Sequence, residues 1–133
     1  MFSMLTTHLL VAFLAMAGSA AAALDEPFTL RIGQSRALSD ADIGLHFVDV
    51  TQDSRCPRDV SCIVAGEAHV VVRAEAGPEA RELVFKVPPA GSDTLTFEGF
   101  TLTITALEPQ TEETRKIEAG DFEATIVVTE KAP

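Results

Sequence analysis

Two cysteines, Cys56 and Cys62, carry the most distinctive chemistry of this chain. They are its only cysteines, and five residues separate them. In an oxidising compartment, two cysteines without other partners form a disulfide with each other. Redox-active pairs usually have two intervening residues, and zinc sites have two to four together with a second pair of ligands. The spacing therefore favours a structural disulfide that closes a short loop and fixes its shape.

Charged residues flank this predicted loop. Asp53 and Arg55 precede it, and Glu67 follows it directly after Gly66. An ion pair between Asp53 and Arg55 would hold the loop rigid, whereas an exposed Arg55 would contact an anionic ligand. Both roles of Arg55 stay open at this point. We predict a candidate binding loop that includes Asp53, Arg55 and Glu67, with Gly66 allowing a bulge or a close backbone approach.

Two histidines raise the possibility of a metal site. His46 and His69 lie in predicted strands at positions that face solvent, so the simplest interpretation is an exposed polar residue in each case. If their strands are neighbours, the two imidazoles could bind copper or zinc together with Asp49 or Glu67. A periplasmic metal-binding protein is therefore the alternative hypothesis. The main interpretation assigns the chain no metal and no cofactor.

The sequence contains no recognisable catalytic motif. It has no Gly-x-Ser-x-Gly segment, no cysteine outside the predicted disulfide and no histidine with an evident carboxylate partner. Asp40 and Asp42 lack the glycine and glutamate that follow in a calcium-binding loop, so they indicate a turn. We therefore predict that the protein is not an enzyme.

The beginning of the chain has the features of a secretory signal. The apolar run at residues 9–17 is too short to span a bilayer, and small residues suited to a signal peptidase follow it. We predict cleavage after Ala22 or Ala23, with residues 1–23 as the signal peptide and residues 24–133 as a single mature domain. The mature protein would be periplasmic or secreted, where a disulfide can form.

The charge balance limits the classes of partner. Twenty acidic residues against ten basic ones give a net charge of −10. Such a surface repels nucleic acids and anionic membranes, so we expect neither as a partner. The acidic residues are scattered along the chain, which favours a role in solubility. We expect a monomer whose partner is an envelope protein or a small ligand.

Short alternating segments predict the fold class. The clearest runs through residues 100–107, where Leu102, Ile104 and Ala106 share one face. No segment has the pattern of an amphipathic helix, and short strands without helices are typical of a sandwich. We predict an all-β, single antiparallel β-sandwich of immunoglobulin-like size. The expected strands are residues 28–32, 43–50, 68–74, 83–87, 94–97, 100–107 and 122–129.

Two local irregularities refine this prediction. The alternation of apolar residues changes parity between Phe47 and Val48, which predicts either a β-bulge there or a strand that crosses from one sheet to the other. Glu98 and Gly99 separate two predicted strands, which is typical of a two-residue hairpin turn in which Gly99 has a positive φ.

The segment from Asp53 to Ala68 resembles a family motif. Its pattern, Asp-Ser-Arg-Cys-Pro-x4-Cys-Ile-x-Ala-Gly-x-Ala, is similar to that of small exported bacterial proteins and lipoproteins whose function is not established. The resemblance implies an exported β domain. Val64 stands where the family pattern has Trp. If that Trp packs against the disulfide, its absence leaves a shallower core, and if it belongs to a binding face, that face is altered here.

The observations converge on one functional hypothesis. We predict a non-enzymatic binding or interaction module of the bacterial envelope. It would present the bridged loop and the neighbouring turns to another protein, for example in the manner of an inhibitor.

Overall fold

The computed structural model describes residues 22–131, which form eight strands and one short 3-10 helix. Most of the predicted signal peptide lies outside the described residues. No helix within this range is long and apolar enough to cross a membrane. The elements are β1 (Phe28–Arg31), β2 (Ser35–Ala37), β3 (Gly44–Asp53), β4 (Ala68–Ala76), β5 (Glu79–Val87), β6 (Asp93–Phe97), β7 (Phe100–Glu108), η1 (Ala119–Asp121) and β8 (Glu123–Glu130).

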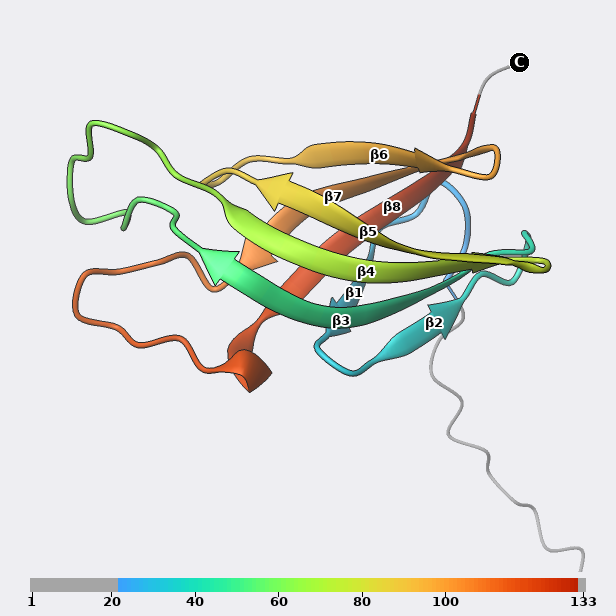
Figure 1. The fold of residues 1–133 in the computed structure, drawn as a ribbon, viewed down its shortest axis with the longest axis horizontal. Helices are drawn as coiled ribbons and strands as arrows, with labels where there is room; N and C mark the ends of the chain where they lie inside the picture. The colour runs from blue at the N-terminus through green and yellow to red at the C-terminus, as the bar shows by residue number, and fades with distance from the viewer. Residues whose placement is uncertain (1–21, 132–133) are drawn as a thin grey trace, which may run out of the picture.

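The strands form two four-stranded antiparallel sheets that pack face to face (Figure 1). One sheet has the order β1-β8-β7-β6 and the other the order β2-β3-β4-β5. The chain therefore builds the predicted all-β sandwich. Strand β3 and strand β7, which lie in different sheets, both end on the same side of the molecule (Figure 1). This arrangement brings the loops that follow them close together.

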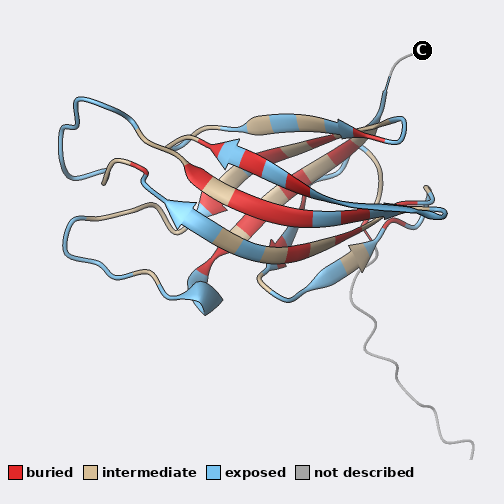
Figure 2. Ribbon diagram, in the orientation of Figure 1, coloured by how far each residue is buried: buried red, intermediate tan, exposed pale blue. Residues whose placement is uncertain are grey.

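The core lies between the two sheets, and strands of both sheets carry the buried residues (Figure 2). Each strand contributes alternate apolar residues, because successive side chains of a strand point to opposite faces. Burying each large aliphatic or aromatic side chain stabilises the fold by about 1.5–3 kcal/mol. The largest fully buried side chains include Leu30, Phe47, Val70, Val72, Phe85, Leu102, Ile104, Ile126 and Val128.

Both predicted irregularities are confirmed. The pairing of β3 with β4 shifts register between Phe47 and Asp49, so the parity change reflects a bulge and not a strand that crosses between sheets. Glu98 and Gly99 connect β6 to β7 with φ values of 47° and 81°, as expected for a two-residue hairpin turn.

Three features of the sheets differ from the prediction. The pairing of β3 with β4 shifts register a second time, between Val50 and Gln52. The pairing of β7 with β8 also shifts, between Ile104 and Ala106, so that Leu107 is buried where a regular alternation would have buried Ala106. Residues 35–37, which are not among the expected strands, form the short edge strand β2. A three-residue strand is too short to show an alternation, and it exists because β3 supplies the hydrogen-bonding partner.

The segment before β1 connects the two sheets. Ala22 is 5% exposed, and its carbonyl accepts a 2.8 Å hydrogen bond from the backbone N–H of Ser39, next to β2. Three residues later, the N–H of Asp25 donates to the carbonyl of Val128 on β8, at 2.9 Å. The predicted cleavage sites after Ala22 and Ala23 both fall within this segment.

Candidate functional site

Two loops meet at one end of the sandwich (Figure 1). We call residues 54–67 the bridged loop and residues 109–118 the facing loop. The N–H of Arg58 donates to the carbonyl of Thr111 at 2.9 Å, and the N–H of Glu113 donates to the carboxylate of Asp59 at 3.0 Å. An ion pair between Arg58 and Glu112 adds a third contact. The facing loop therefore supports one side of the bridged loop.

Cys56 and Cys62 form the predicted disulfide within the bridged loop. The range 22–131 contains no other cysteine and therefore no free thiol. This confirms the single short-loop disulfide and makes a thiolate nucleophile or thiolate metal ligand impossible while the bridge is intact.

Arg55 lies inside the protein, with 1% of its side chain exposed. Its Nε and Nη2 atoms donate to the two carboxylate oxygens of Asp53, each at 2.8 Å. Its Nη1 donates to the carbonyl of Leu107 at 2.9 Å, and Nη2 also donates to the carbonyl of Pro109 at 3.0 Å. Arg55 thus ties the bridged loop to the end of β7 and the start of the facing loop, and a ligand in solvent does not reach it.

The two ends of the bridged loop run side by side beyond the last pair of β3 and β4. The N–H of Ser54 donates to the carbonyl of Glu67 at 2.9 Å. Gly66 has a φ of +71°, and a Cβ atom there would lie 1.8 Å from the carbonyl oxygen of Ser54. The close backbone approach predicted for Gly66 is confirmed, and no other residue fits without moving the backbone.

The bridged loop exposes apolar side chains at its tip. Ile63 is fully exposed, Val64 is 75% exposed and Val60 is 39% exposed. Among residues 22–131, the only other exposed large apolar side chain is Val84 on β5. We call Ile63 and Val64 the apolar tip. Position 64 is a surface position, so a Trp there would change the surface of the loop and not the core.

Sequence reasoning noted Val64 only as a replacement for the Trp of the family pattern and did not predict that Ile63 and Val64 are exposed together, because they precede a predicted strand and resemble its apolar start. One signal could have identified them. Two consecutive aliphatic residues follow a half-cystine and precede Ala-Gly, at a place with no alternation that would assign either of them to a core.

The remaining predicted loop residue, Glu67, lies at the surface beside His69. Its carboxylate is 2.7 Å from Nε2 of His69, and both side chains are partly exposed. Of the three candidate binding residues, Asp53 and Arg55 therefore pair with each other under the loop, and Glu67 lies at its outer edge.

The register of β3 and β4 keeps His46 and His69 apart. His46 lies opposite Arg73, whereas His69 lies opposite Gln52. The two pairs lie four positions apart along β4, which corresponds to about 13 Å at a rise of ~3.3 Å per residue. The part of the chain that the structure describes contains no group of three or more His, Cys, Asp and Glu side chains able to hold a metal ion. The strands are neighbours, as the metal hypothesis required, but they do not bring the imidazoles to one ion.

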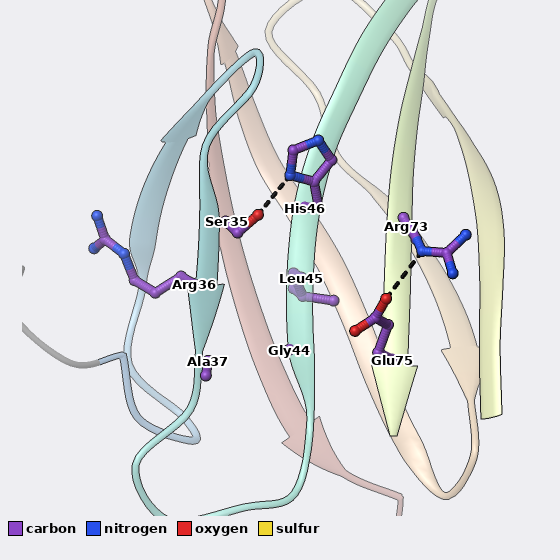
Figure 3. Close-up of a pocket in the computed structure, with 8 residues that line it drawn as sticks. All are labelled: Ser35, Arg36, Ala37, Gly44, Leu45, His46, Arg73 and Glu75. Carbon is purple, nitrogen blue, oxygen red and sulfur yellow. Dashed lines mark hydrogen bonds and ion pairs between the residues drawn. The ribbon is translucent and has the colours of Figure 1, made fainter. Parts of the chain in front are cut away.

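A shallow depression of about 380 Å³ lies on the outer face of β2, β3 and β4 (Figure 3). Within it, Oγ of Ser35 is 2.5 Å from Nδ1 of His46, and Nε of Arg73 donates to the carboxylate of Glu75 at 3.0 Å. A serine nucleophile needs a histidine that a carboxylate orients through the other ring nitrogen. Glu75 is paired with Arg73, and no carboxylate within residues 22–131 is hydrogen-bonded to His46. The pair therefore lacks the third member of a catalytic triad.

No protein-family model, curated protein or solved structure matches this chain. The functional inference therefore depends on the geometry of the two loops and on the chemistry of the side chains that they expose.

Proposed function

We propose that this chain is an exported, non-enzymatic binding module of the bacterial envelope, which holds a partner protein at its bridged loop. One observation carries the proposal. Three of the four exposed large apolar side chains in the range 22–131, those of Val60, Ile63 and Val64, lie in this single loop.

Exposed apolar side chains that gather in one place are typical of interaction sites. Burying an aliphatic side chain is worth about 1.5–3 kcal/mol, which the free protein does not gain at Ile63 or Val64. A complex with a partner that buries these side chains in an apolar pocket would gain this free energy. Most of the binding free energy of a protein interface comes from a few such central residues.

The loop is also held in place before any partner arrives. The disulfide, the buried Arg55 and the contacts with the facing loop each restrict it. Ordering a flexible loop on binding costs free energy, and a loop that is already ordered avoids this cost. Rigid support under exposed apolar residues favours recognition over a purely structural role for the loop.

Charge and compartment define the partner further. The net charge of −10 favours a partner with a basic surface around its apolar pocket. A stable disulfide fits an oxidising compartment such as the periplasm or the exterior.

Photocrosslinking tests the proposal in the living cell. A benzoylphenylalanine residue is placed at position 63, or at position 84 as the matched control, because Val84 is the one exposed large apolar residue outside the loop. We expect a crosslinked protein adduct from position 63 and none from position 84. Adducts of equal yield from both positions, or none from position 63, would contradict the proposal.

A further inference from the structure

Ala22 is an integral part of the folded domain. It is 5% exposed and belongs to the same buried apolar cluster as Phe28 and Leu38. It forms a parallel β-bridge with Leu38, and its carbonyl accepts a 2.8 Å hydrogen bond from the N–H of Ser39. A chain that begins after Ala22 would leave this N–H without its partner and uncover apolar surface of the cluster.

The residues that follow Ala22 are attached to the domain as well. The N–H of Leu24 donates to Oδ1 of Asp40 at 3.0 Å, and the N–H of Asp25 donates to the carbonyl of Val128 on β8 at 2.9 Å. Hydrogen bonds on both sides therefore enclose the two peptide bonds between Ala22 and Leu24. A peptidase needs an accessible segment of chain, so it reaches these two bonds only where the domain has not folded or has opened locally.

The sequence by itself allows the signal to be cut at several bonds. A signal peptidase selects small residues directly before the bond that it cuts and two positions earlier. Residues 18–23 read Gly-Ser-Ala-Ala-Ala-Ala, so the bonds after residues 20, 21, 22 and 23 all satisfy this rule. Only the last two of these bonds lie within the segment that the folded domain holds.

From these observations we propose that signal peptidase cuts this chain no later than the bond between Ala21 and Ala22, so that the exported protein keeps Ala22. The reaction adds one water molecule, which leaves a carboxylate on the released signal peptide and an ammonium group on the first residue of the mature chain. This site precedes the cuts after Ala22 or Ala23 that the sequence suggests. The inference depends on the export that the proposed function includes, and not on binding at the bridged loop.

The first residue of the exported protein tests the inference. The full chain of 133 residues is expressed in a bacterial host, and the protein recovered outside the cytoplasm is analysed by intact mass spectrometry and N-terminal sequencing. We expect a chain that begins at Ala22 or at an earlier residue. A chain that begins at Ala23 or Leu24 overturns the inference.

A substitution at position 21 separates the structural argument from the rule of small residues. In Ala21→Glu, the large charged side chain blocks the bonds after residues 21 and 23, because it lies directly before the first and two positions before the other. The bonds after residues 20 and 22 still satisfy the rule. We expect the cut to move to the bond after residue 20, which again keeps Ala22. A product that begins at Ala23 would show that the fold does not decide the site.

Ala23→Glu is the matched control. Position 23 lies outside the recognised positions of every bond up to that between Ala21 and Ala22, but it lies directly before the bond to Leu24. We expect this variant to begin at the same residue as the unchanged protein and to be exported in the same yield. Accumulation of its uncut precursor would place the natural cut after Ala23 and refute the inference.

The two proposals fail in different ways. A mature chain that begins at Ala23 or Leu24 removes this inference and leaves the exported binding module intact. An unchanged protein found only as the uncut chain in the cytoplasm refutes both. If the cut precedes Ala22 but position 63 forms no crosslink, the processing site stands and the binding module is wrong.

Discussion

Gly66 shows how a single residue shapes the bridged loop. Two of its properties demand glycine: a φ of +71° and a carbonyl oxygen of Ser54 that would lie 1.8 Å from any Cβ atom. Gly33 shares only the first of these, with a φ of +89° and nothing within 4 Å of a Cβ atom. Replacing Gly33 therefore costs only the free energy of an unfavourable φ, whereas replacing Gly66 adds the free energy of a steric clash.

We expect Gly66→Ala to destabilise the protein more than Gly33→Ala. The unfavourable φ costs about 1–2 kcal/mol at either position, and forced repacking of the backbone around Ser54 adds about 1–3 kcal/mol at Gly66 alone. Urea unfolding of the two variants measures the difference. Equal losses would show that Ser54 moves aside freely and that the stem of the loop is not rigid.

The side chain at position 64 lies on the surface of the bridged loop. The sequence left two roles open for the Trp that the resembling family has there, a core residue or part of a binding face. Because Val64 is 75% exposed, the difference lies on the surface of the loop. It would change the surface that the loop exposes, with little effect on the core.

At the scale of elements, Arg55 joins the bridged loop to the other sheet. Its guanidinium group links Asp53 at the end of β3 to the carbonyls of Leu107 and Pro109, which lie 52 and 54 residues away in the sequence. Arg58 makes a second link between the loops, to Glu112, but its side chain is 66% exposed. Arg55 and Arg58 thus both connect the bridged loop to the facing loop, Arg55 in the interior and Arg58 at the surface.

Arg55→Ala should lower the free energy of unfolding by about 3–5 kcal/mol, because Asp53 is left without its buried partner. Arg58→Ala should cost less than about 1 kcal/mol, since water screens an exposed ion pair. Thermal or urea unfolding of both variants provides the measurement. A similar effect of the two substitutions would mean that Arg55 does not hold the loops together.

The strands themselves were largely predictable from the sequence. Alternation predicted the main strands and the bulge after Phe47, because which side chains face the core depends on nearest neighbours in the chain. The register shifts between Val50 and Gln52 and between Ile104 and Ala106 were not predicted. Ala106 fits an apolar face by its type, and only the pairing with β8 places Leu107 in the core instead.

At the scale of the whole molecule, residues 22–25 close the space between the two sheets on one side. Ala22 accepts a hydrogen bond next to β2, and Asp25 donates one to β8. The position of the first mature residue therefore affects the sandwich as a whole.

A purified chain that begins at Ala22 should be more stable than one that begins at Leu24, the mature start that cleavage after Ala23 would give. The shorter chain loses the buried methyl group of Ala22 and the partner of the Ser39 N–H, which together are worth about 1 kcal/mol. Thermal unfolding of the two purified chains measures the difference. Identical melting temperatures would show that the edge between the sheets does not need this segment.

The amino-acid sequence alone determined the strands, the disulfide and the sandwich, because alternation, spacing and turn residues act over short distances along the chain. It could not decide whether Arg55 faces solvent or the interior. That depends on carbonyl groups more than 50 residues away, which only folding brings within hydrogen-bonding distance. The exposure of Ile63 and Val64 was decided in the same way. Within residues 22–131 the tertiary structure leaves these two apolar side chains exposed, and no local pattern of the sequence can show that.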